Sequence, residues 1–197
     1  MVKGDMESNI LGRAIRYAIE RQRMQVAMQS LSLVDDLTGL FNRRGFMTLA
    51  HQEMKTAGRV GNPVVIMFCD LDSLKGINDT HGHTAGDQAL REVAYILHAS
   101  FRDSDIIARL GGDEFAIYAM LTADVDEYML RTRVEQAIEE KNRRGDLPFA
   151  ISLSIGMVRY QPDGSQTLED LLEEADRRMY EEKHLHKLRV IAKVSNG

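Results

Sequence analysis

Hydrophobic positions recur at helical and strand spacings through most of the chain and predict alternating helices and strands. A continuous apolar run with β-branched residues, 63–69, is typical of a buried strand that ends at Asp70. Gly111 and Gly112 separate two short apolar segments and predict a hairpin. The predicted helices cover 43–57, 72–80 (a short helix or turn), 85–101, 124–144 and 167–186, and the predicted strands cover 63–69, 105–109, 114–120, 149–160 and 188–194.

The order of these elements predicts the fold class. Helices and strands follow one another without a regular strand–helix repeat, and the central hairpin requires antiparallel pairing. We therefore expect a mixed α/β (α+β) body over residues 33–197.

The first 32 residues carry a different pattern, with apolar positions spaced alternately four and three apart. Such spacing forms a heptad seam, which here is interrupted only by Arg21. We expect residues 1–32 to form a signalling helix that pairs with a second copy as a coiled-coil stalk. The alternative is an amphipathic helix packed on its own domain. The seam positions are Ile10, Ala14, Tyr17, Arg21, Met24, Met28 and Leu31.

Composition narrows the class of protein. Hydrophobic residues make up 44% and charged residues 28%, which is ordinary for a globular protein and argues against disorder. A net charge of -5 gives no support for nucleic-acid binding. The longest apolar run is too short for a membrane helix, the N-terminus lacks the apolar core of a signal peptide, and the single cysteine fits a reducing compartment. We expect a cytoplasmic protein without a membrane partner.

Acidic residues lie at the ends of two predicted strands. Asp70 and Asp72 follow the apolar run, and Asp113 and Glu114 follow the glycine pair. If the strands are neighbours, Asp70 and Asp113 converge, and two carboxylates at a sheet edge can hold Mg²⁺. A single strand-end aspartate is more often simply solvated, but glycines at 111 and 112 allow the backbone close to a ligand and favour a site.

Further polar residues could bind a nucleotide. The Asp87 carboxylate can accept hydrogen bonds from the N–H donors of a guanine base. The Asn78 amide can donate one hydrogen bond to the base and accept another from it. Taken alone, Asp87 is equally an acid at a helix N-terminus. Three lysines are candidate phosphate partners, although each could be an ordinary exposed lysine: Lys75, Lys183 and Lys187.

Other kinds of site fit poorly. The segment from Asp70 fails as an EF-hand loop because Leu74 occupies the fifth position, and no P-loop motif is present. The pairs His81/His83 and His184/His186 lack the spacing of further ligands that a zinc site needs. Cys69 lies within the apolar strand and is expected in the core.

The motif at 111–115 and several others resemble the GGDEF family of diguanylate cyclases. The matching blocks, in the family's order and spacing, are DDLTGLFNRR at 35–44, DLDSLKGIND at 70–79, GHTAGD at 82–87, RLGGDEF at 109–115, SIG at 154–156 and Ala175, Asp176, Tyr180 and Lys183. The resemblance implies a mostly antiparallel five-stranded sheet wrapped by helices. It also implies the condensation of two GTP molecules into cyclic di-GMP and two pyrophosphates across a homodimer.

The resemblance also assigns roles to residues. Asp70 and Asp113 match the side-chain ligands of Mg²⁺ or Mn²⁺, with the Leu71 carbonyl as a further ligand, and Glu114 matches an active-site acid. The remaining matches are the guanine-recognising pair Asn78 and Asp87, the phosphate-binding lysines Lys75 and Lys183, and the phosphate-binding amides around Ser73 and Leu74.

The chain departs from the family pattern at two places. Leu74 stands where the family often has Phe, and Lys187 replaces an arginine that helps to bind phosphate. Lysine keeps the charge but loses the guanidinium fork, so we expect weaker nucleotide binding. These departures keep open an alternative function, a nucleotide-binding signalling module without turnover, although the central motif is intact.

Two regulatory features complete the resemblance. Arg102 and Asp105 match the family's Arg-x-x-Asp site for inhibition by the cyclic di-GMP product. Without that spacing they would be read as an exposed ion pair. The N-terminal residues are similar to the end of a receiver domain that runs into its output linker, so we expect an upstream receiver or sensory domain as a partner.

Overall fold

We describe the protein from a computed structural model, which covers residue 17 and residues 32–122, 125–161 and 165–195, the side chains of 185–195 excepted. The chain divides into two units, residues 1–32 and 33–197, of which the second is described below. The predicted heptad seam lies outside the described residues except for Tyr17, which is helical and exposed. The stalk therefore stays a prediction.

The second unit contains five helices and five strands among its described residues. In chain order they are β1 (Phe41–Asn42), α2 (Arg43–Val60), β2 (Val64–Leu71), α3 (Leu74–His81), α4 (His83–Ser100), β3 (Ile106–Gly111), β4 (Glu114–Met120), α5 (Glu127–Arg144), β5 (Leu153–Tyr160) and α6 (Leu168–Ser195). None of the described helices is long and apolar enough to cross a lipid bilayer.

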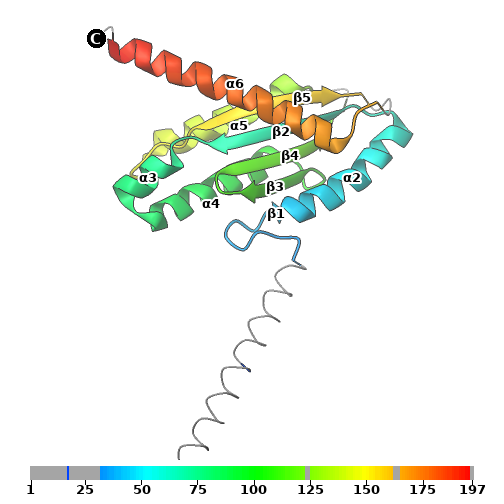
Figure 1. Ribbon diagram of the computed structural model, residues 1–197, viewed down its shortest axis with the longest axis horizontal. Helices are drawn as coiled ribbons and strands as arrows, with labels where there is room; N and C mark the ends of the chain where they lie inside the picture. The colour runs from blue at the N-terminus through cyan, green and yellow to red at the C-terminus, as the bar shows by residue number, and fades with distance from the viewer. Residues whose placement is uncertain (1–16, 18–31, 123–124, 162–164, 196–197) are drawn as a thin grey trace, which may run out of the picture. The chain divides into compact units, whose positions relative to one another are not determined.

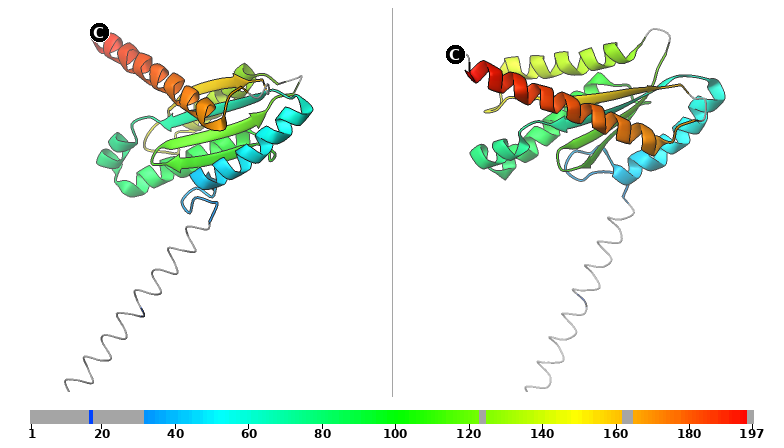
Figure 2. Two further views of the ribbon diagram at one scale, coloured as in Figure 1. Left: turned by 45° about the vertical axis from the view of Figure 1, so that its right-hand side comes forward. Right: turned by 45° about the horizontal axis from the view of Figure 1, so that its top comes forward.

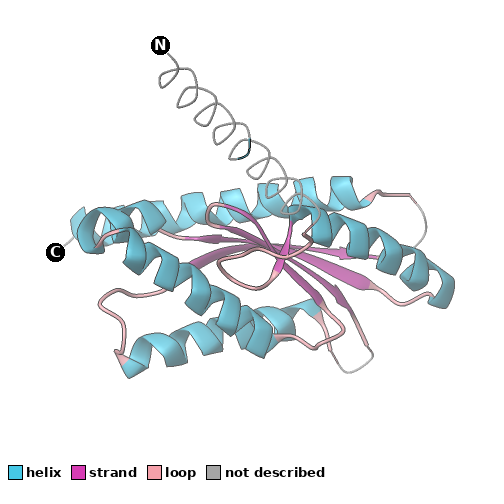
Figure 3. Ribbon diagram, turned by 90° about the horizontal axis from the view of Figure 1, so that it is seen from below, coloured by secondary structure: helices cyan, strands magenta, loops and turns pink. Residues whose placement is uncertain are grey.

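The strands form one sheet in the order β1-β3-β4-β2-β5, which lies between helices (Figure 3). β2 pairs antiparallel with both β4 and β5, and β3 pairs antiparallel with β4. Only the short β1 runs parallel to its neighbour, β3. The prediction of a mostly antiparallel five-stranded sheet in an α+β fold is confirmed.

Helices cover both faces of the sheet (Figures 1 and 2), and a hydrophobic core lies on each face. Alternate residues of β2 point to opposite faces, so that Val65 and Met67 join a core with α4 and α5, whereas Ile66 and Phe68 join a core with α2 and α6. All eight residues of β2 are buried, as expected for a central strand with both faces covered. The buried Cys69 lies in the first of these cores.

Local signals set several helix ends. The Asn42 side chain accepts from the Gly45 N–H at 2.9 Å and begins α2, which ends at Gly61 in the left-handed conformation. Asp126 caps α5 in the same way, and Gly145 ends it. These caps explain why most predicted helices agree with the structure to within a few residues.

The predicted last strand, 188–194, is wrong. Those residues continue α6, which runs without interruption from Leu168 to Ser195. No glycine or proline separates them from the preceding helix, so the β-branched residues at 190, 191 and 194 were an insufficient signal for a strand. The fifth strand is instead β1, two residues long, which the sequence did not indicate.

Candidate active site

The acidic end of the sheet is built by neighbouring strands. β2 ends with Asp70 and Leu71, and Asp70 lies opposite Glu114 of β4 in the ladder. The Leu71 N–H donates to the Asp113 carbonyl at 2.9 Å. The strands that carry Asp70 and Asp113 are thus neighbours, which is the condition under which the sequence predicts that the two carboxylates converge.

Asp70 is the most buried of these acids, with 8% of its surface exposed. Its carboxylate forms an ion pair and hydrogen bond with the Lys183 ammonium of α6. Burial raises the pKa of Asp70, the hydrogen bond from Lys183 lowers it, and the nearby Asp113 raises it again, with a net upward shift. This carboxylate therefore depends on a neighbouring cation, which is Lys183 in this structure.

The loop after β2 is held by hydrogen bonds between Asp72 and the serines at 152 and 154. Asp72 accepts hydrogen bonds from the Ser152 and Ser154 hydroxyls at 2.7 and 2.8 Å, and its N–H donates to the Ser152 carbonyl at 2.9 Å. Ser73 follows with φ 59° and ψ 26°, the one left-handed non-glycine residue in the described chain. Such a conformation persists when surrounding contacts enforce it. The start of α3, with Leu74 as its first residue, is consequently well defined.

The hairpin that carries Asp113 turns through two glycines with positive φ, 149° at Gly111 and 53° at Gly112. Arg109 holds this turn, because its Nε and Nη2 donate to the Gly112 carbonyl at 3.0 and 2.8 Å. That carbonyl belongs to the peptide unit that enters Asp113. Asp113 is therefore fixed on both sides, by Arg109 before it and by Leu71 at its own carbonyl.

Arg109 is itself anchored by Asp35, at 3.3 Å from Nη1 to each carboxylate oxygen. Burial would raise the pKa of Asp35, but hydrogen bonds from Thr38 and the charge and hydrogen bond of Arg109 outweigh it and lower the pKa. Both residues stand in motif blocks that the sequence analysis quoted, but no role was assigned to them. Their opposite charges were the available signal, and the tertiary structure was needed to pair them.

Glu114 lies beside a cation that the sequence analysis also left without a role. Arg43, the first residue of α2, places its Nη2 3.9 Å from the Glu114 carboxylate. Burial raises the pKa of Glu114, Arg43 opposes this, and the acids Asp176, Asp113 and Asp70 add to the rise. Glu114 therefore holds a proton more readily than an isolated glutamate, which suits a group that exchanges protons.

The candidate nucleotide-binding residues lie on α3 and α4. Asn78 of α3 is half-buried against Gly86 of α4, where a Cβ atom would come within 2.1 Å of the Asn78 Oδ1. Asp87 follows Gly86 and is exposed, as is Lys75 on α3. Close packing against Gly86 thus holds the Asn78 side chain in place, whereas the side chains of Asp87 and Lys75 are exposed to solvent. The side chain of Lys187 lies outside the described residues.

The donor set at the acidic end fits a hard divalent cation. Asp70 and Asp113 offer carboxylate oxygens, and the backbone of β2 offers the Leu71 carbonyl. Within the described ranges, no group of three or more His, Cys, Asp and Glu side chains is arranged to hold a metal ion. Any cation here would need water or phosphate oxygens to complete its shell, as Mg²⁺ commonly does.

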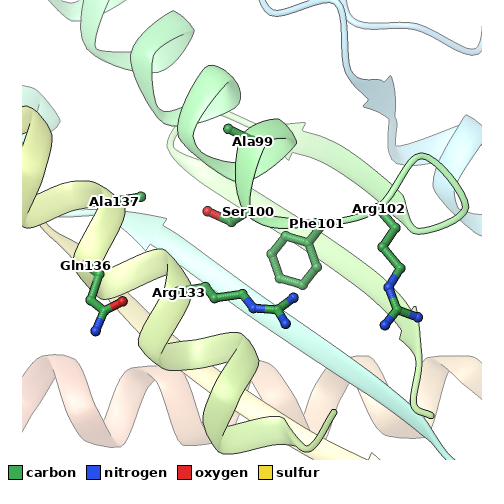
Figure 4. A pocket seen from close by; sticks show the side chains of 7 residues that line it. All are labelled: Ala99, Ser100, Phe101, Arg102, Arg133, Gln136 and Ala137. Carbon is green, nitrogen blue, oxygen red and sulfur yellow. The ribbon is translucent and has the colours of Figure 1, made fainter. Parts of the chain in front are cut away.

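A second candidate site lies at the end of α4. The Arg102 N–H donates to the Asp105 carboxylate at 2.9 Å, and Arg102 also lines a pocket of about 410 Å³ between α4 and α5. Arg133 of α5 lines the same pocket with Phe101 (Figure 4). Burial raises the pKa of Asp105, while Arg102 and Arg133 oppose the rise. Arg133 was not predicted from the sequence, because only the fold brings α5 beside the residues at 102–105.

Comparison with known proteins gives consistent results. The family described as diguanylate cyclase, GGDEF domain, matches residues 32–189. Diguanylate cyclase DosC of Escherichia coli is 38% identical over 152 residues, which are 75% of this chain and 32% of DosC. Cyclic di-GMP phosphodiesterase NbdA of Pseudomonas aeruginosa is 35% identical over 157 residues, 80% of this chain and 20% of NbdA. The chain thus spans a third or less of either protein.

Solved structures agree with these matches. The GGDEF domain of DgcB from Caulobacter crescentus, solved in complex with c-di-GMP, has a TM-score of 0.68 at 29% identity and covers 78% of this chain and 91% of that chain. With the family match over most of its length and the acidic hairpin in place, this chain belongs to the diguanylate cyclase GGDEF domain family.

Proposed function

We propose that this chain is an active diguanylate cyclase domain that condenses two GTP molecules into cyclic di-GMP and two pyrophosphates. One observation carries the proposal: Asp70, Asp113 and Glu114 lie together at one end of the sheet, and Lys183 forms an ion pair with Asp70. The similarity to DosC, a protein named as a diguanylate cyclase, supports it.

In this proposal the acidic end holds Mg²⁺ or Mn²⁺ through Asp70, Asp113 and the Leu71 carbonyl. A bound cation supplies neutralisation of the triphosphate charge. Lys183, which pairs with Asp70 in this structure, would turn toward phosphate oxygens when the triphosphate binds. Lys75, Lys187 and the amides of Ser73 and Leu74 complete the phosphate contacts.

The remaining residues position the base and move a proton. Asn78 and Asp87 bind the guanine base through hydrogen bonds, because an amide and a carboxylate complement the hydrogen-bond donors and the acceptor of guanine. Glu114 accepts the proton of the 3′-hydroxyl as its oxygen attacks the α-phosphorus of the second GTP, with pyrophosphate leaving. The raised pKa of Glu114 makes it a better proton acceptor than an ordinary surface glutamate.

One assay tests the enzyme proposal. The protein incubated with GTP and Mg²⁺ should form cyclic di-GMP, and Asp113→Ala and Glu114→Ala should each abolish it. Glu139→Ala, a change of an exposed acid on α5, is the matched control and should leave turnover unchanged. Absence of product at high protein concentration would contradict the proposal.

Two subunits are needed, because each is proposed to hold one GTP. We propose that residues 1–32 pair two copies and raise the local concentration of the catalytic domains. Arg21 at a seam position should weaken the pairing, so activity per subunit should fall on dilution. Deleting residues 1–32 should lower that activity most in dilute solution. If the deletion leaves the dilution curve unchanged, the stalk has no part in the mechanism.

We propose that the product binds at Arg102 and Asp105 and inhibits turnover. The pocket beside Arg102 and the nearby Arg133 support this, since two guanidinium groups can pair with phosphates or with guanine. Progress curves should flatten as cyclic di-GMP accumulates, and Arg102→Ala should straighten them at a nearly unchanged initial rate. Equal responses of wild type and Arg102→Ala to added product would remove this role.

The whole protein is proposed to receive its signal from an upstream receiver or sensory domain, since the chain spans only part of DosC and NbdA. We propose a cytoplasmic location because the substrate would be GTP. Testing the domain together with its natural upstream sequence, with and without phosphorylation of a receiver aspartate, would show whether the input changes turnover.

A binding module without turnover is the second candidate. The observation in its favour is that α6 continues as a helix through the altered block around Lys187. Calorimetry that shows binding of GTP or cyclic di-GMP, combined with no product in the turnover assay, would favour it over the cyclase.

A further inference from the structure

Among the described side chains of α6, those through residue 184, the buried ones lie in its first part. Leu168, Leu171, Ala175 and Met179 are buried on it. Gly156 of β5 allows the close approach, because a Cβ there would come within 2.0 Å of the Ala175 carbonyl oxygen. Of the next five side chains, through His184, none is fully buried. Lys183 therefore stands one turn beyond Met179, the last buried side chain of α6 among those described.

An ion pair from the opposite layer reaches this turn. Arg131 belongs to α5, which packs on the other face of the sheet from α6. Its Nη2 donates to Glu182 Oε1 at 2.7 Å, and its Nη1 donates to the Ile155 carbonyl of the edge strand β5 at 3.4 Å. The Arg131 side chain thus passes the edge of the sheet and joins the two helical layers.

The geometry of this pair is favourable. The side chains of Arg131 and Glu182 are 32% and 24% exposed, so water screens them less than a surface pair. Arg131 Nε also donates to Glu135 Oε1 on its own helix at 2.7 Å, which orients the guanidinium plane. Hydrogen bonding to Glu182 raises the pKa of Arg131, so the cation is permanent at any working pH.

Two ion pairs tie this turn to other elements. Among the described side chains from Tyr180 to His184, the pairs Arg131–Glu182 and Lys183–Asp70 reach outside α6, whereas Glu181 and the Tyr180–His184 ring contact stay within it. The second of these ion pairs weakens when Lys183 turns toward phosphate. During that exchange, Arg131 is left to hold the turn.

We propose that Arg131 is a positioning residue that fixes the outer turn of α6, through Glu182, so that Lys183 stays within reach of both Asp70 and a bound triphosphate. The inference rests on the proposed function only in naming the triphosphate. The fixing of the turn stands on the contacts alone.

The binding test uses a GTP analogue with a methylene group between the α- and β-phosphorus, which binds but cannot react, together with Mg²⁺. Arg131→Gln and Glu182→Gln should each raise its dissociation constant by about fivefold to tenfold, as expected for a lost charge-assisted hydrogen bond. Arg131→Lys should have a smaller effect, because it keeps the charge but loses the fork. Glu139→Gln, a change of an exposed acid on the same helix, is the matched control and should stay within about twofold, since the Arg131–Glu182 pair remains.

A double variant separates positioning from general damage. Lys183→Met alone should weaken binding of the analogue, and adding Arg131→Gln to it should weaken binding no further, because Arg131 acts through Lys183. Fully additive effects would overturn the proposal. In turnover assays, Arg131→Gln should raise KM for GTP more than it lowers kcat.

Hydrogen exchange tests the turn itself without nucleotide. Arg131→Gln should speed exchange of the amides at 181–184 by about tenfold and leave those of β2 unchanged. Unchanged exchange at 181–184 would overturn the proposal. A wild type that binds the analogue but forms no cyclic di-GMP would defeat the proposed enzyme and leave this inference standing. No binding at all would refute the role of Lys183 and with it the nucleotide part of the inference.

Discussion

The hairpin that carries Asp113 and the outer turn of α6 that carries Lys183 both lie beside Asp70, but different kinds of contact hold them in place. The hairpin is tied through its backbone, by the β2–β4 ladder, the Leu71–Asp113 hydrogen bond and the Arg109 contacts to Gly112. The outer turn of α6 depends on side-chain ion pairs, those of Glu182 and Lys183. The acids at this end of the sheet are thus positioned by backbone hydrogen bonds, whereas Lys183 is held by a side-chain pair that can exchange partners.

This difference suits the proposed chemistry. Groups that hold a cation gain from a fixed geometry, because little reorganisation is then needed on binding. A lysine that leaves Asp70 for a phosphate must move, and ion pairs at a partly exposed helix end rearrange more easily than a strand ladder.

Gly156→Val should have the largest effect, because it removes the anchor of α6. A side chain at 156 would meet the backbone of α6, at 2.0 Å from the Ala175 carbonyl and 2.3 Å from the Met179 nitrogen. We expect the free energy of unfolding to fall by about 3 kcal/mol, measured by chemical denaturation. Gly58→Ala is the control: its site in α2 is open, so stability should stay constant or rise. Equal stability of Gly156→Val and wild type would show that α6 does not lie this close to β5.

Arg109→Ala should damage the hairpin. It removes two hydrogen bonds to Gly112 and leaves Asp35 without its cation, which we expect to cost about 2 kcal/mol of stability. Turnover should fall by at least about tenfold in the folded protein, as Asp113 loses its fixed approach. Arg143→Ala, which breaks an exposed pair on α5, should change neither quantity measurably. A normal turnover in Arg109→Ala would show that the ladder alone positions Asp113.

Gly86→Ala should affect nucleotide binding more than stability. The added methyl group would lie 2.1 Å from the Asn78 Oδ1, so the amide must turn away from its present position. We expect the KM for GTP to rise by about fivefold to tenfold, with a smaller change in kcat. Gly76→Ala, whose nearest neighbour would lie at 3.8 Å, should leave KM unchanged. If both variants behave alike, Asn78 does not contact the base.

The smallest effect should be the acid dependence of the Asp35–Arg109 pair. The pKa of Asp35 is lowered in the folded protein, so its contribution to stability is present above the unfolded pKa of about 4 and is lost as the pH falls through the lower folded value. Asp35→Asn should therefore lower stability at neutral pH and narrow its gap to wild type as the solution is acidified. Urea denaturation at several pH values measures this gap, and a gap that stays constant below pH 4 would argue against the pair.

The sequence was sufficient for most elements because their signals are local. The apolar run before Asp70, the glycine pair at 111 and 112 and the caps at Asn42 and Asp126 each depend on nearby residues. The same local reasoning failed at 188–194, where β-branched residues indicated a strand but nothing interrupted the helix. It also missed β1, whose two residues pair with β3 and, through Phe41, with Val34.

The sequence by itself also determined which acids end β2 and begin β4, since the chemistry and the order of those residues are fixed along the chain. The tertiary structure alone decided which charges meet. Asp35 and Arg109 are far apart in sequence, as are Arg131 and Glu182, and no periodicity relates them. Ion pairs between distant segments depend on strand order and on which helices share an edge of the sheet, and these are properties of the whole packing.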